Sequence, residues 1–114
     1  MKPAPVARST RVKTSSPAAE PGRLAGEPPV GACVVADGRI VATAHTAVVG
    51  GPDATAHAEV LAIRAACQQL RTPFLAGCEL YVTVEPCAMC VAALHSAGIT
   101  HVWFGADLGV MQAA

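Results

Sequence analysis

Two short motifs in this 114-residue chain carry side chains that could bind a metal ion and transfer protons. They are His57-Ala58-Glu59 and Pro86-Cys87-Ala88-Met89-Cys90, and each lies at the start of a predicted helix. Two cysteines three residues apart in a first helical turn direct their sulfurs to one point, and the helix dipole lowers their pKa. With a neutral imidazole as third ligand, tetrahedral zinc keeps an open position, which is typical of a catalytic site. The sequence therefore predicts one zinc ion per chain, bound by His57, Cys87 and Cys90.

Glu59 is the residue in these motifs that could act as both acid and base. An acidic residue in the first turn of a helix often does no more than complement the helix dipole. Beside zinc it has a second use, because zinc lowers the pKa of bound water from about 16 to roughly 7. A carboxylate could carry the released proton to a ring nitrogen of a substrate and then to a departing amine. We therefore expect Glu59 to be catalytic and not a metal ligand.

The remaining thiols and imidazoles have less specific patterns. Cys33 and Cys67 fall at core-facing positions and are expected to be packing residues. Cys78, just before a predicted strand, is the other thiol that could approach the metal. A fourth protein ligand, Cys78 or Cys67, would favour a structural rather than a catalytic zinc site. Three further histidines are expected to be surface or core residues without a metal: His45, His95 and His101.

The pattern of apolar residues predicts the elements that position the first motif. Residues 30–36 and 39–43 are rich in β-branched side chains, and the Asp37-Gly38 pair between them favours a two-residue hairpin. A Gly-rich loop follows, and apolar residues at helical spacing then predict a helix over 58–70. The first motif therefore lies where a loop enters a helix.

A strand, a helix and a second strand are predicted around the second motif. Alternating apolar residues predict a strand over 79–84, and Pro86 suits the start of a helix over 87–97. Gly98 is expected to end this helix, and a strand over 101–105 follows. Strand, helix and strand at this spacing predict a crossover between two parallel strands.

The composition, 53% hydrophobic and 14% charged, is typical of one small soluble domain. Residues 1–27 are rich in Pro, Ala and basic side chains and are predicted to be a disordered tail, followed by one folded domain over 28–114. No apolar run approaches the roughly 18 residues that span a bilayer. Five cysteines, two of them in a CxxC pair, predict a reducing, cytoplasmic location with metal ligation rather than disulfides.

Charge is distributed unevenly along the chain, although the formal net charge is zero. Residues 1–29 carry five basic and two acidic side chains, whereas residues 30–114 carry three basic and six acidic ones. A folded part with that balance is a poor phosphate-binding surface, which weakens the case for a polynucleotide substrate.

From Pro28 to Asp107 the chain resembles the cytidine-deaminase superfamily, in the branch of tRNA adenosine deaminases, guanine deaminases and nucleoside deaminases. The order His-x-Glu followed by Pro-Cys-x-x-Cys is a zinc-deaminase signature. The resemblance also includes the segments Pro29-Val30-Gly31-Ala32, Asp53-Ala54-Thr55-Ala56, Leu80-Tyr81-Val82-Thr83-Val84-Glu85 and Phe104-Gly105-Ala106-Asp107.

The resemblance implies an α/β fold, a three-layer α/β/α cytidine-deaminase-like sandwich with a mixed sheet, here truncated at both ends. It implies that residues 28–114 form a zinc-dependent deaminase domain with catalytic Glu59. It also implies substrate contacts from Thr46, Ala58 and Pro86. Thr46 departs from the family, which usually has an asparagine at that position to contact the base.

The function that follows is zinc-dependent hydrolytic deamination of a nucleobase or nucleoside. One alternative is a tRNA-specific adenosine deaminase that converts adenosine to inosine in an anticodon, and another is a non-catalytic structural zinc module or accessory subunit. Shortened ends would leave an apolar face and a sheet edge uncovered, so we expect a homodimer or a partner chain. No membrane partner is expected.

Overall fold

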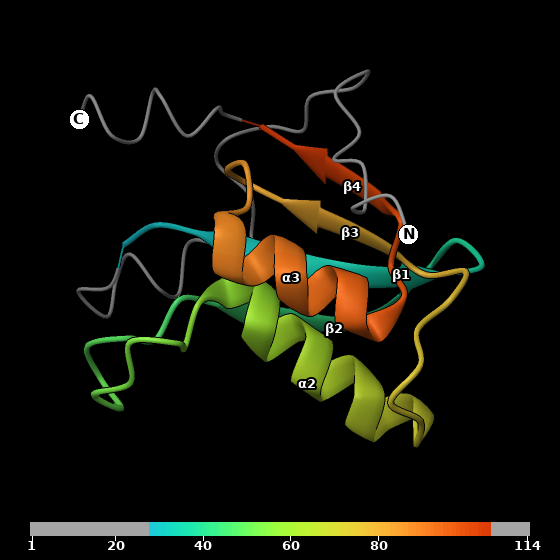
Figure 1. Ribbon diagram of the computed structural model, residues 1–114, viewed down its shortest axis with the longest axis horizontal. Coiled ribbons are helices and arrows are strands. Elements are labelled where there is room, and N and C mark those ends of the chain that lie inside the picture. The colour runs from blue at the N-terminus through green and yellow to red at the C-terminus, as the bar shows by residue number, and fades with distance from the viewer. Residues whose placement is uncertain (1–27, 106–114) are drawn as a thin grey trace.

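The computed structural model describes residues 28–105, which form a four-stranded mixed sheet and two helices (Figure 1). The strand order is β2-β1-β3-β4. β1 is antiparallel to both of its neighbours, whereas β3 and β4 are parallel, so the predicted α/β class and parallel crossover are confirmed. The strands are β1 (Gly31–Ala36), β2 (Arg39–His45), β3 (Glu79–Val82) and β4 (His101–Phe104).

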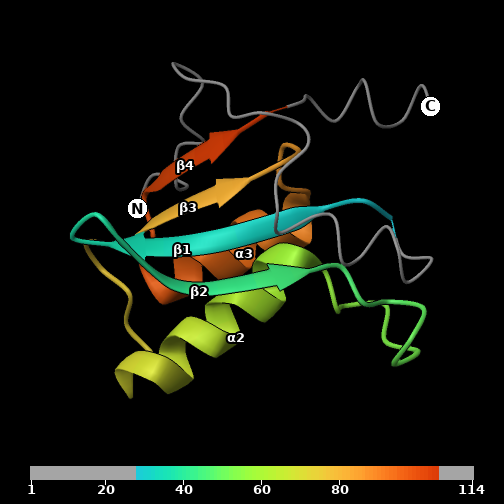
Figure 2. The same ribbon diagram turned by 180° about the vertical axis from the view of Figure 1, so that it is seen from behind.

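Both helices, α2 (Ala58–Leu70) and α3 (Ala88–Ala97), cover the same face of the sheet (Figures 1 and 2). Of the three layers expected, the described residues therefore supply two, the sheet and one layer of helices. The predicted tail, 1–27, lies outside the described residues. Neither helix in 28–105 has the length and apolar character needed to cross a membrane.

The hairpin between β1 and β2 turns at Asp37 and Gly38, as predicted. Their φ angles are 52° and 75°, and two consecutive positive φ angles are typical of the primed turns that match the twist of paired strands. β2 extends two residues beyond the predicted end at residue 43, because His45 still pairs with Gly31. β2 therefore ends directly beside the start of β1.

β3 ends at Val82 rather than at the predicted residue 84. Beyond Val82, the Thr83 N–H donates to the Gly31 carbonyl at 3.0 Å, and the Thr83 hydroxyl accepts from the Gly31 N–H at 3.2 Å. The chain then leaves the sheet and enters α3. This departure brings Cys87 to the end of the sheet where α2 begins.

α3 ends at Gly98, as predicted from the sequence. Gly98 has a φ of 87°, and its N–H bonds to the carbonyls of Leu94 and His95. The Ile99 N–H also bonds to Leu94, at 3.0 Å, and the Ile99 side chain is fully buried. This pattern is a Schellman-type end, in which only glycine adopts the left-handed conformation without strain.

The hydrophobic core fills the space between the sheet and the two helices. It is built from small and branched aliphatic side chains, so the helices approach the sheet closely. Its fully buried members include Val34, Ala58, Ala62, Ala66, Leu75, Leu80, Leu94 and Ile99.

Candidate metal centre and active site

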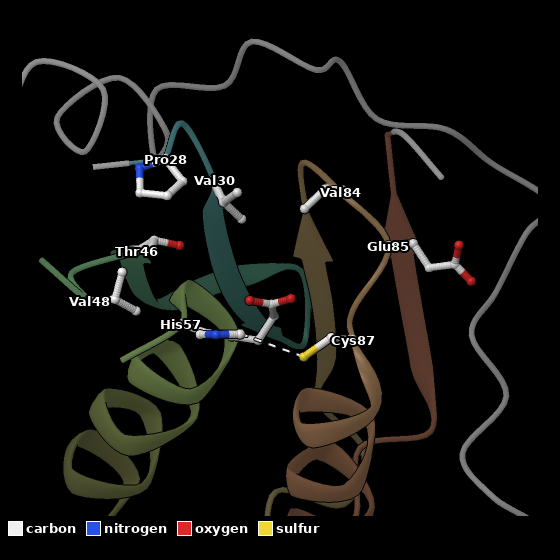
Figure 3. A pocket seen from close by; sticks show the side chains of 9 residues that line it. Pro28, Val30, Thr46, Val48, His57, Val84, Glu85 and Cys87 are labelled. Atoms are coloured by element: carbon white, nitrogen blue, oxygen red, sulfur yellow. Dashed lines mark hydrogen bonds between the residues drawn. The ribbon is translucent and has the colours of Figure 1, made fainter. Parts of the chain in front are cut away.

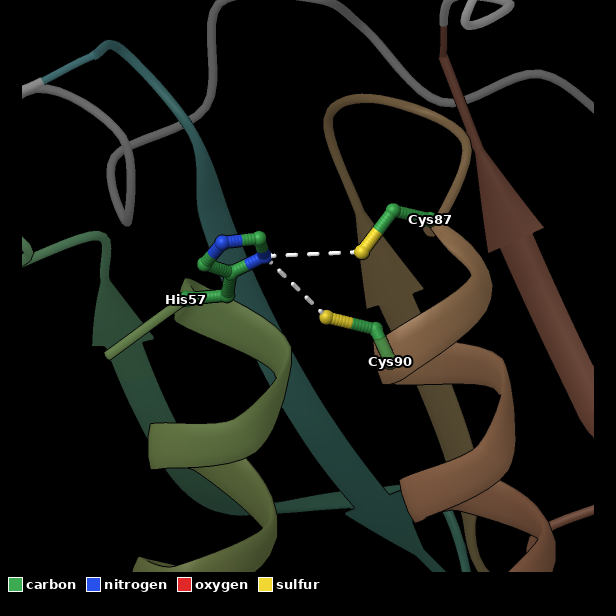
Figure 4. A group of neighbouring side chains, drawn as sticks. All are labelled: His57, Cys87 and Cys90. Carbon is green, nitrogen blue, oxygen red and sulfur yellow. Dashed lines mark hydrogen bonds between the residues drawn. The ribbon is translucent and has the colours of Figure 1, made fainter. Parts of the chain in front are cut away.

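The starts of α2 and α3 meet at one end of the sheet, and each helix begins at a potential metal ligand (Figure 4). His57 is the N-cap residue of α2 and Cys87 is the N-cap residue of α3. Neither side chain forms the hydrogen bond that an N-cap side chain usually makes to its own helix. Both side chains instead turn toward each other, and Cys90 joins them from the first turn of α3.

The three side chains are spaced as ligands of one metal ion. The His57 Nδ1 lies 3.6 Å from the Cys87 Sγ and 3.4 Å from the Cys90 Sγ, and all three ligand atoms lie within 4.8 Å of one another. Tetrahedral zinc with Zn–S near 2.3 Å and Zn–N near 2.0–2.1 Å requires an N···S separation of about 3.6 Å. The donor set and its spacing therefore fit zinc, as predicted for these three residues.

Glu59 is a buried carboxyl group beside this centre. Its side chain is 3% exposed, although it stands in the first turn of an otherwise amphipathic helix. Burial raises the pKa of the Glu59 carboxyl above its ordinary value, because the charged form is poorly solvated there. A buried carboxyl with a raised pKa next to metal ligands is a candidate for proton transfer rather than a simple helix-capping charge.

The thiol of Cys90 is the most deeply buried of the three ligands. The expectation that the helix dipole lowers the pKa of this thiol is wrong for the metal-free site, because burial, followed by the nearby Glu59 and Cys87, raises that pKa well above its ordinary value. Zinc reverses that preference, because a coordinated thiol loses its proton. Metal binding at this site is therefore coupled to the release of a proton from α3.

A cavity of about 200 Å³ opens beside the metal ligands (Figure 3). Aliphatic side chains from the segments before β1, after β2 and after β3 form most of its wall, while His57, Glu59 and Cys87 form one side. No lysine or arginine of the described segment lines it. The lining residues are Pro28, Val30, Thr46, Val48, His57, Glu59, Val84, Glu85 and Cys87.

Of the three expected substrate contacts, Thr46 lines this cavity and is 6% exposed. Ala58 is fully buried, and its N–H donates to the Thr46 hydroxyl at 3.3 Å. Pro86 is also buried. Neither Ala58 nor Pro86 lines the cavity, but each is the chain neighbour of residues that do.

The other cysteines and histidines of the described segment lie outside the metal group, as expected for most of them. Cys78 directly precedes β3, whose first residue pairs with the hairpin end of β1, so Cys78 lies at the opposite end of the sheet. Burial raises the pKa of the Cys78 thiol, with smaller contributions from Asp37 and Cys67. The metal group found among the described residues consists of His57, Cys87 and Cys90. It contains neither Cys67 nor Cys78, and none of the histidines His45, His95 and His101.

Sequence reasoning missed most of the cavity wall. Val84 and Glu85 directly precede the second motif, so the sequence could have placed them near the metal. Pro28, Val30 and Val48 carry no chemical signal, because isolated apolar residues in loops and strand ends fit many roles. Only the folding of β1 and the loop after β2 brings them to the metal.

Fold, ligand geometry and buried carboxyl together define a zinc deaminase domain. The chain belongs to the family described as the cytidine and deoxycytidylate deaminase zinc-binding region, whose model matches residues 8–106. This confirms the resemblance, and with it zinc as the metal that suits the His57, Cys87 and Cys90 site.

Two curated relatives illustrate which kinds of deaminase the chain is similar to. It is 54% identical over 81 residues to a tRNA-specific adenosine deaminase of Aquifex aeolicus, covering 71% of this chain and 54% of that protein. It is 44% identical over 79 residues to a guanine deaminase of Bacillus subtilis, covering 69% of this chain and 51% of that protein. The chain thus spans about half the length of these two curated relatives.

Two solved structures show similarity to the same two kinds of deaminase. A tRNA:A34 deaminase superposes with a TM-score of 0.79 at 40% identity, over 82% of this chain and 72% of that one. A guanine deaminase from Bacillus subtilis superposes with a TM-score of 0.78 at 41% identity, over 84% of this chain and 62% of that one. The fold is thus equally close to a deaminase that edits RNA and to one named for a free base.

Proposed function

We propose that this chain catalyses the zinc-dependent hydrolytic deamination of a nucleobase or nucleoside, converting a ring amine to a carbonyl and releasing ammonia. The observation that carries the proposal is the buried carboxyl of Glu59 beside a three-ligand metal centre and a largely apolar cavity. Zinc bound there supplies Lewis acidity and a water of lowered pKa. The chain supplies the ligands, a proton carrier and a largely apolar cavity.

Glu59 is the proposed proton carrier of the reaction. Its carboxylate takes one proton from the attacking water and gives it to the ring nitrogen. It then takes the second proton from the hydroxyl group now on the ring carbon and gives it to the amine, which departs as ammonia while the carbonyl forms. The raised pKa supports this role, because a group that both accepts and returns protons works best when its pKa approaches the working pH. Its 3% exposure also keeps the transferred proton away from bulk water.

The cavity supports a single uncharged base as the reacting group. Its volume of about 200 Å³ is below the range of about 300–1,000 Å³ usual for drug-sized ligands. Its lining includes two acidic residues, Glu59 and Glu85, the second with its carboxyl directed away from the metal ligands (Figure 3). It includes no cation among the described residues, so a phosphate inside it would be unpaired. The three cations of residues 28–105 lie outside its lining: Arg39 follows the hairpin turn, Arg64 lies on α2 close enough to affect Asp53, and Arg71 ends α2.

Adenosine in a tRNA anticodon is the second candidate substrate. The specific observation in its favour is the 54% identity over 81 residues to a relative named tRNA-specific adenosine deaminase. The reaction at the purine ring would be the same, since enzymes of this kind act on a base that has left the helical stack. The two candidates differ in whether a polymer carries the base.

A non-catalytic zinc module has less support. A structural zinc site normally has four protein ligands. Within residues 28–105, the metal group holds three, and Cys78 lies at the far end of the sheet. We therefore favour the enzyme.

The test is ammonia release by the zinc-loaded protein with a panel of free bases, nucleosides and tRNA transcripts, with inosine in the transcript measured separately. Glu59→Gln should slow product formation by about 10²–10⁴-fold with zinc retained. Glu79→Gln is the matched control, because Glu79 begins β3 at the opposite end of the sheet. Zinc-loaded, folded protein that releases no ammonia from any member of the panel would contradict the proposal.

We also propose that the chain acts as a homodimer. Ile40 is 66% exposed on β2, which is an edge strand of the sheet, and an apolar edge strand is a site where a second chain can pair or pack. Sedimentation at micromolar concentration tests this, and a stable monomer would contradict it.

The domain limits and location remain proposals as well. We propose a deaminase domain over 28–114 preceded by a tail over 1–27, which limited proteolysis would test by the position of the first cuts. The five free cysteines support a reducing, cytoplasmic location. Fractionation of cells that produce the chain would test that location.

A further inference from the structure

Thr46 is held in place from three directions at the point where β2 leaves the sheet. Its N–H donates to the Val30 carbonyl at 3.0 Å, and its carbonyl accepts from the Nδ1 of His45 at 3.0 Å. Its hydroxyl accepts from the Ala58 N–H at 3.3 Å, and the residue is 6% exposed. Thr46 therefore connects the start of β1, the end of β2 and the start of α2.

The Ala58 N–H is the first N–H of α2 and has no acceptor within the helix. The N-cap residue of α2 is His57, whose side chain makes no capping bond because its ring faces the two cysteines. A capping bond would in any case go to the second or third N–H of the helix. The first N–H therefore depends on an acceptor from elsewhere, which is the Thr46 hydroxyl, twelve residues earlier in the chain.

The position of that N–H makes the bond relevant to chemistry. Ala58 stands between the metal ligand His57 and the buried carboxyl of Glu59. A bond that fixes the Ala58 peptide therefore fixes the directions in which both neighbouring side chains leave the backbone. Loss of the bond would allow the helix start to shift, although every residue that touches the metal would still be present.

We propose that Thr46 is a positioning residue, whose hydroxyl holds the first peptide of α2 and so keeps His57 directed at the metal site and Glu59 directed at the cavity. The part that concerns metal binding stands on the contacts above, whereas the part that concerns turnover rests on the proposed function. Thr46 also lines the cavity, so direct contact with a substrate is the rival role. If Thr46 positions the helix start, loss of its hydroxyl changes metal affinity and kcat. If Thr46 contacts the substrate, loss of its hydroxyl changes only KM.

The first experiment measures metal binding without any substrate. Thr46→Val keeps the shape of the side chain and removes the acceptor, whereas Thr46→Ser keeps the hydroxyl. Cobalt(II) affinity is measured by the thiolate-to-metal absorption band, and zinc affinity by competition with a chelator. Removing a residue that orients a ligand weakens metal binding about tenfold, so Thr46→Val should show that loss and Thr46→Ser should stay within about twofold of the parent.

Thr83→Val is the matched control for loss of a buried threonine bond. Thr83 is 5% exposed, and its hydroxyl accepts from the Gly31 N–H at 3.2 Å, within the sheet rather than at a helix start. It should lower the melting temperature of the protein as much as Thr46→Val does, yet leave metal affinity unchanged. If Thr46→Val does not fold, Thr46→Ala removes the same hydroxyl without a branched side chain to fit, and the same loss of affinity is expected.

The second experiment measures steady-state kinetics of the zinc-saturated variants on any substrate that the parent deaminates. Positioning predicts a lower kcat with little change in KM for Thr46→Val, and rescue by Thr46→Ser. Unchanged metal affinity with a raised KM would overturn the proposal in favour of substrate contact. Equal loss of metal affinity in Thr46→Val and Thr83→Val would overturn it in favour of general destabilisation. If the parent has no activity, the proposed function fails, while the cobalt experiment still decides the role of Thr46.

Discussion

Helices α2 and α3 both direct their N-termini at the metal centre, but they hold their functional side chains in different ways. α3 supplies two ligands by itself, Cys87 as its N-cap and Cys90 in its first turn. α2 supplies one ligand, His57, together with the carboxyl of Glu59, and its first N–H is bonded by a side chain from another element. One helical turn is thus enough to place two thiols, whereas the start of α2, which carries a ligand and a proposed proton carrier, is also bonded by Thr46 from the loop after β2.

Removal of a ligand from either helix should have the largest effect. Cys90→Ala and His57→Ala should each lose zinc and all measurable turnover, because neither helix completes the site alone. Both should also lower the melting temperature, since the binding energy of a metal site is also folding energy. Cys67→Ala is the control, because Cys67 lies in the last turn of α2, packs against the core and is outside the metal group. Metal analysis decides, and full zinc occupancy in Cys90→Ala would refute the assignment of α3.

Glu59→Gln should separate the two functions of α2. We expect kcat to fall by about 10²–10⁴-fold, because a positioned acid and base contributes that much, while zinc occupancy remains full. The folded protein should not be destabilised, since a neutral amide is less costly to bury than a carboxylate. Loss of zinc from a folded Glu59→Gln protein would mean that Glu59 is a ligand.

The zinc affinity of the site should depend on pH through the Cys90 thiol of α3. The pKa of the Cys90 thiol is raised by burial and by nearby Glu59 and Cys87, so this thiol carries a proton at neutral pH in the metal-free protein. Zinc must displace that proton, and affinity should therefore rise with pH by about tenfold per unit for each proton released. Competition with a chelator between pH 6 and 8 measures the slope. A flat profile would show that the thiols are already ionised before metal binds.

The far ends of the two helices should give the smallest effects, and of opposite sign. α3 ends at Gly98 with a φ of 87°, whereas α2 ends at Arg71 with a φ of 58°. Gly98→Ala should cost about 1 kcal/mol, because a side chain is strained in the left-handed conformation. Arg71→Gly should stabilise by roughly 0.5 kcal/mol for the same reason, reduced by the greater freedom of glycine in the unfolded chain. Urea denaturation measures the free energy of unfolding of both variants. A Gly98→Ala protein that is more stable than the parent would contradict the strain explanation.

Local patterns in the sequence were sufficient for much of the fold. The hairpin at Asp37 and Gly38, the helix over 58–70 and the helix end at Gly98 were all predicted, because turn and helix signals act over a few residues. Strand ends were predicted less well. β3 stops at Val82 because Thr83 bonds to Gly31 on a strand distant in sequence, and such a bond leaves no local pattern.

The same division applies to the candidate site. Residue types and spacing by themselves were enough to predict the metal, its three ligands and a role for the carboxyl of Glu59, because ligand chemistry and helical geometry restrict which side chains can converge on zinc. Only the tertiary structure decided that Cys78 lies at the far end of the sheet from the metal and that Thr46 bonds the start of α2. The physical reason is that both outcomes depend on how β1 pairs and where β2 ends, which is settled by packing between residues far apart in the chain.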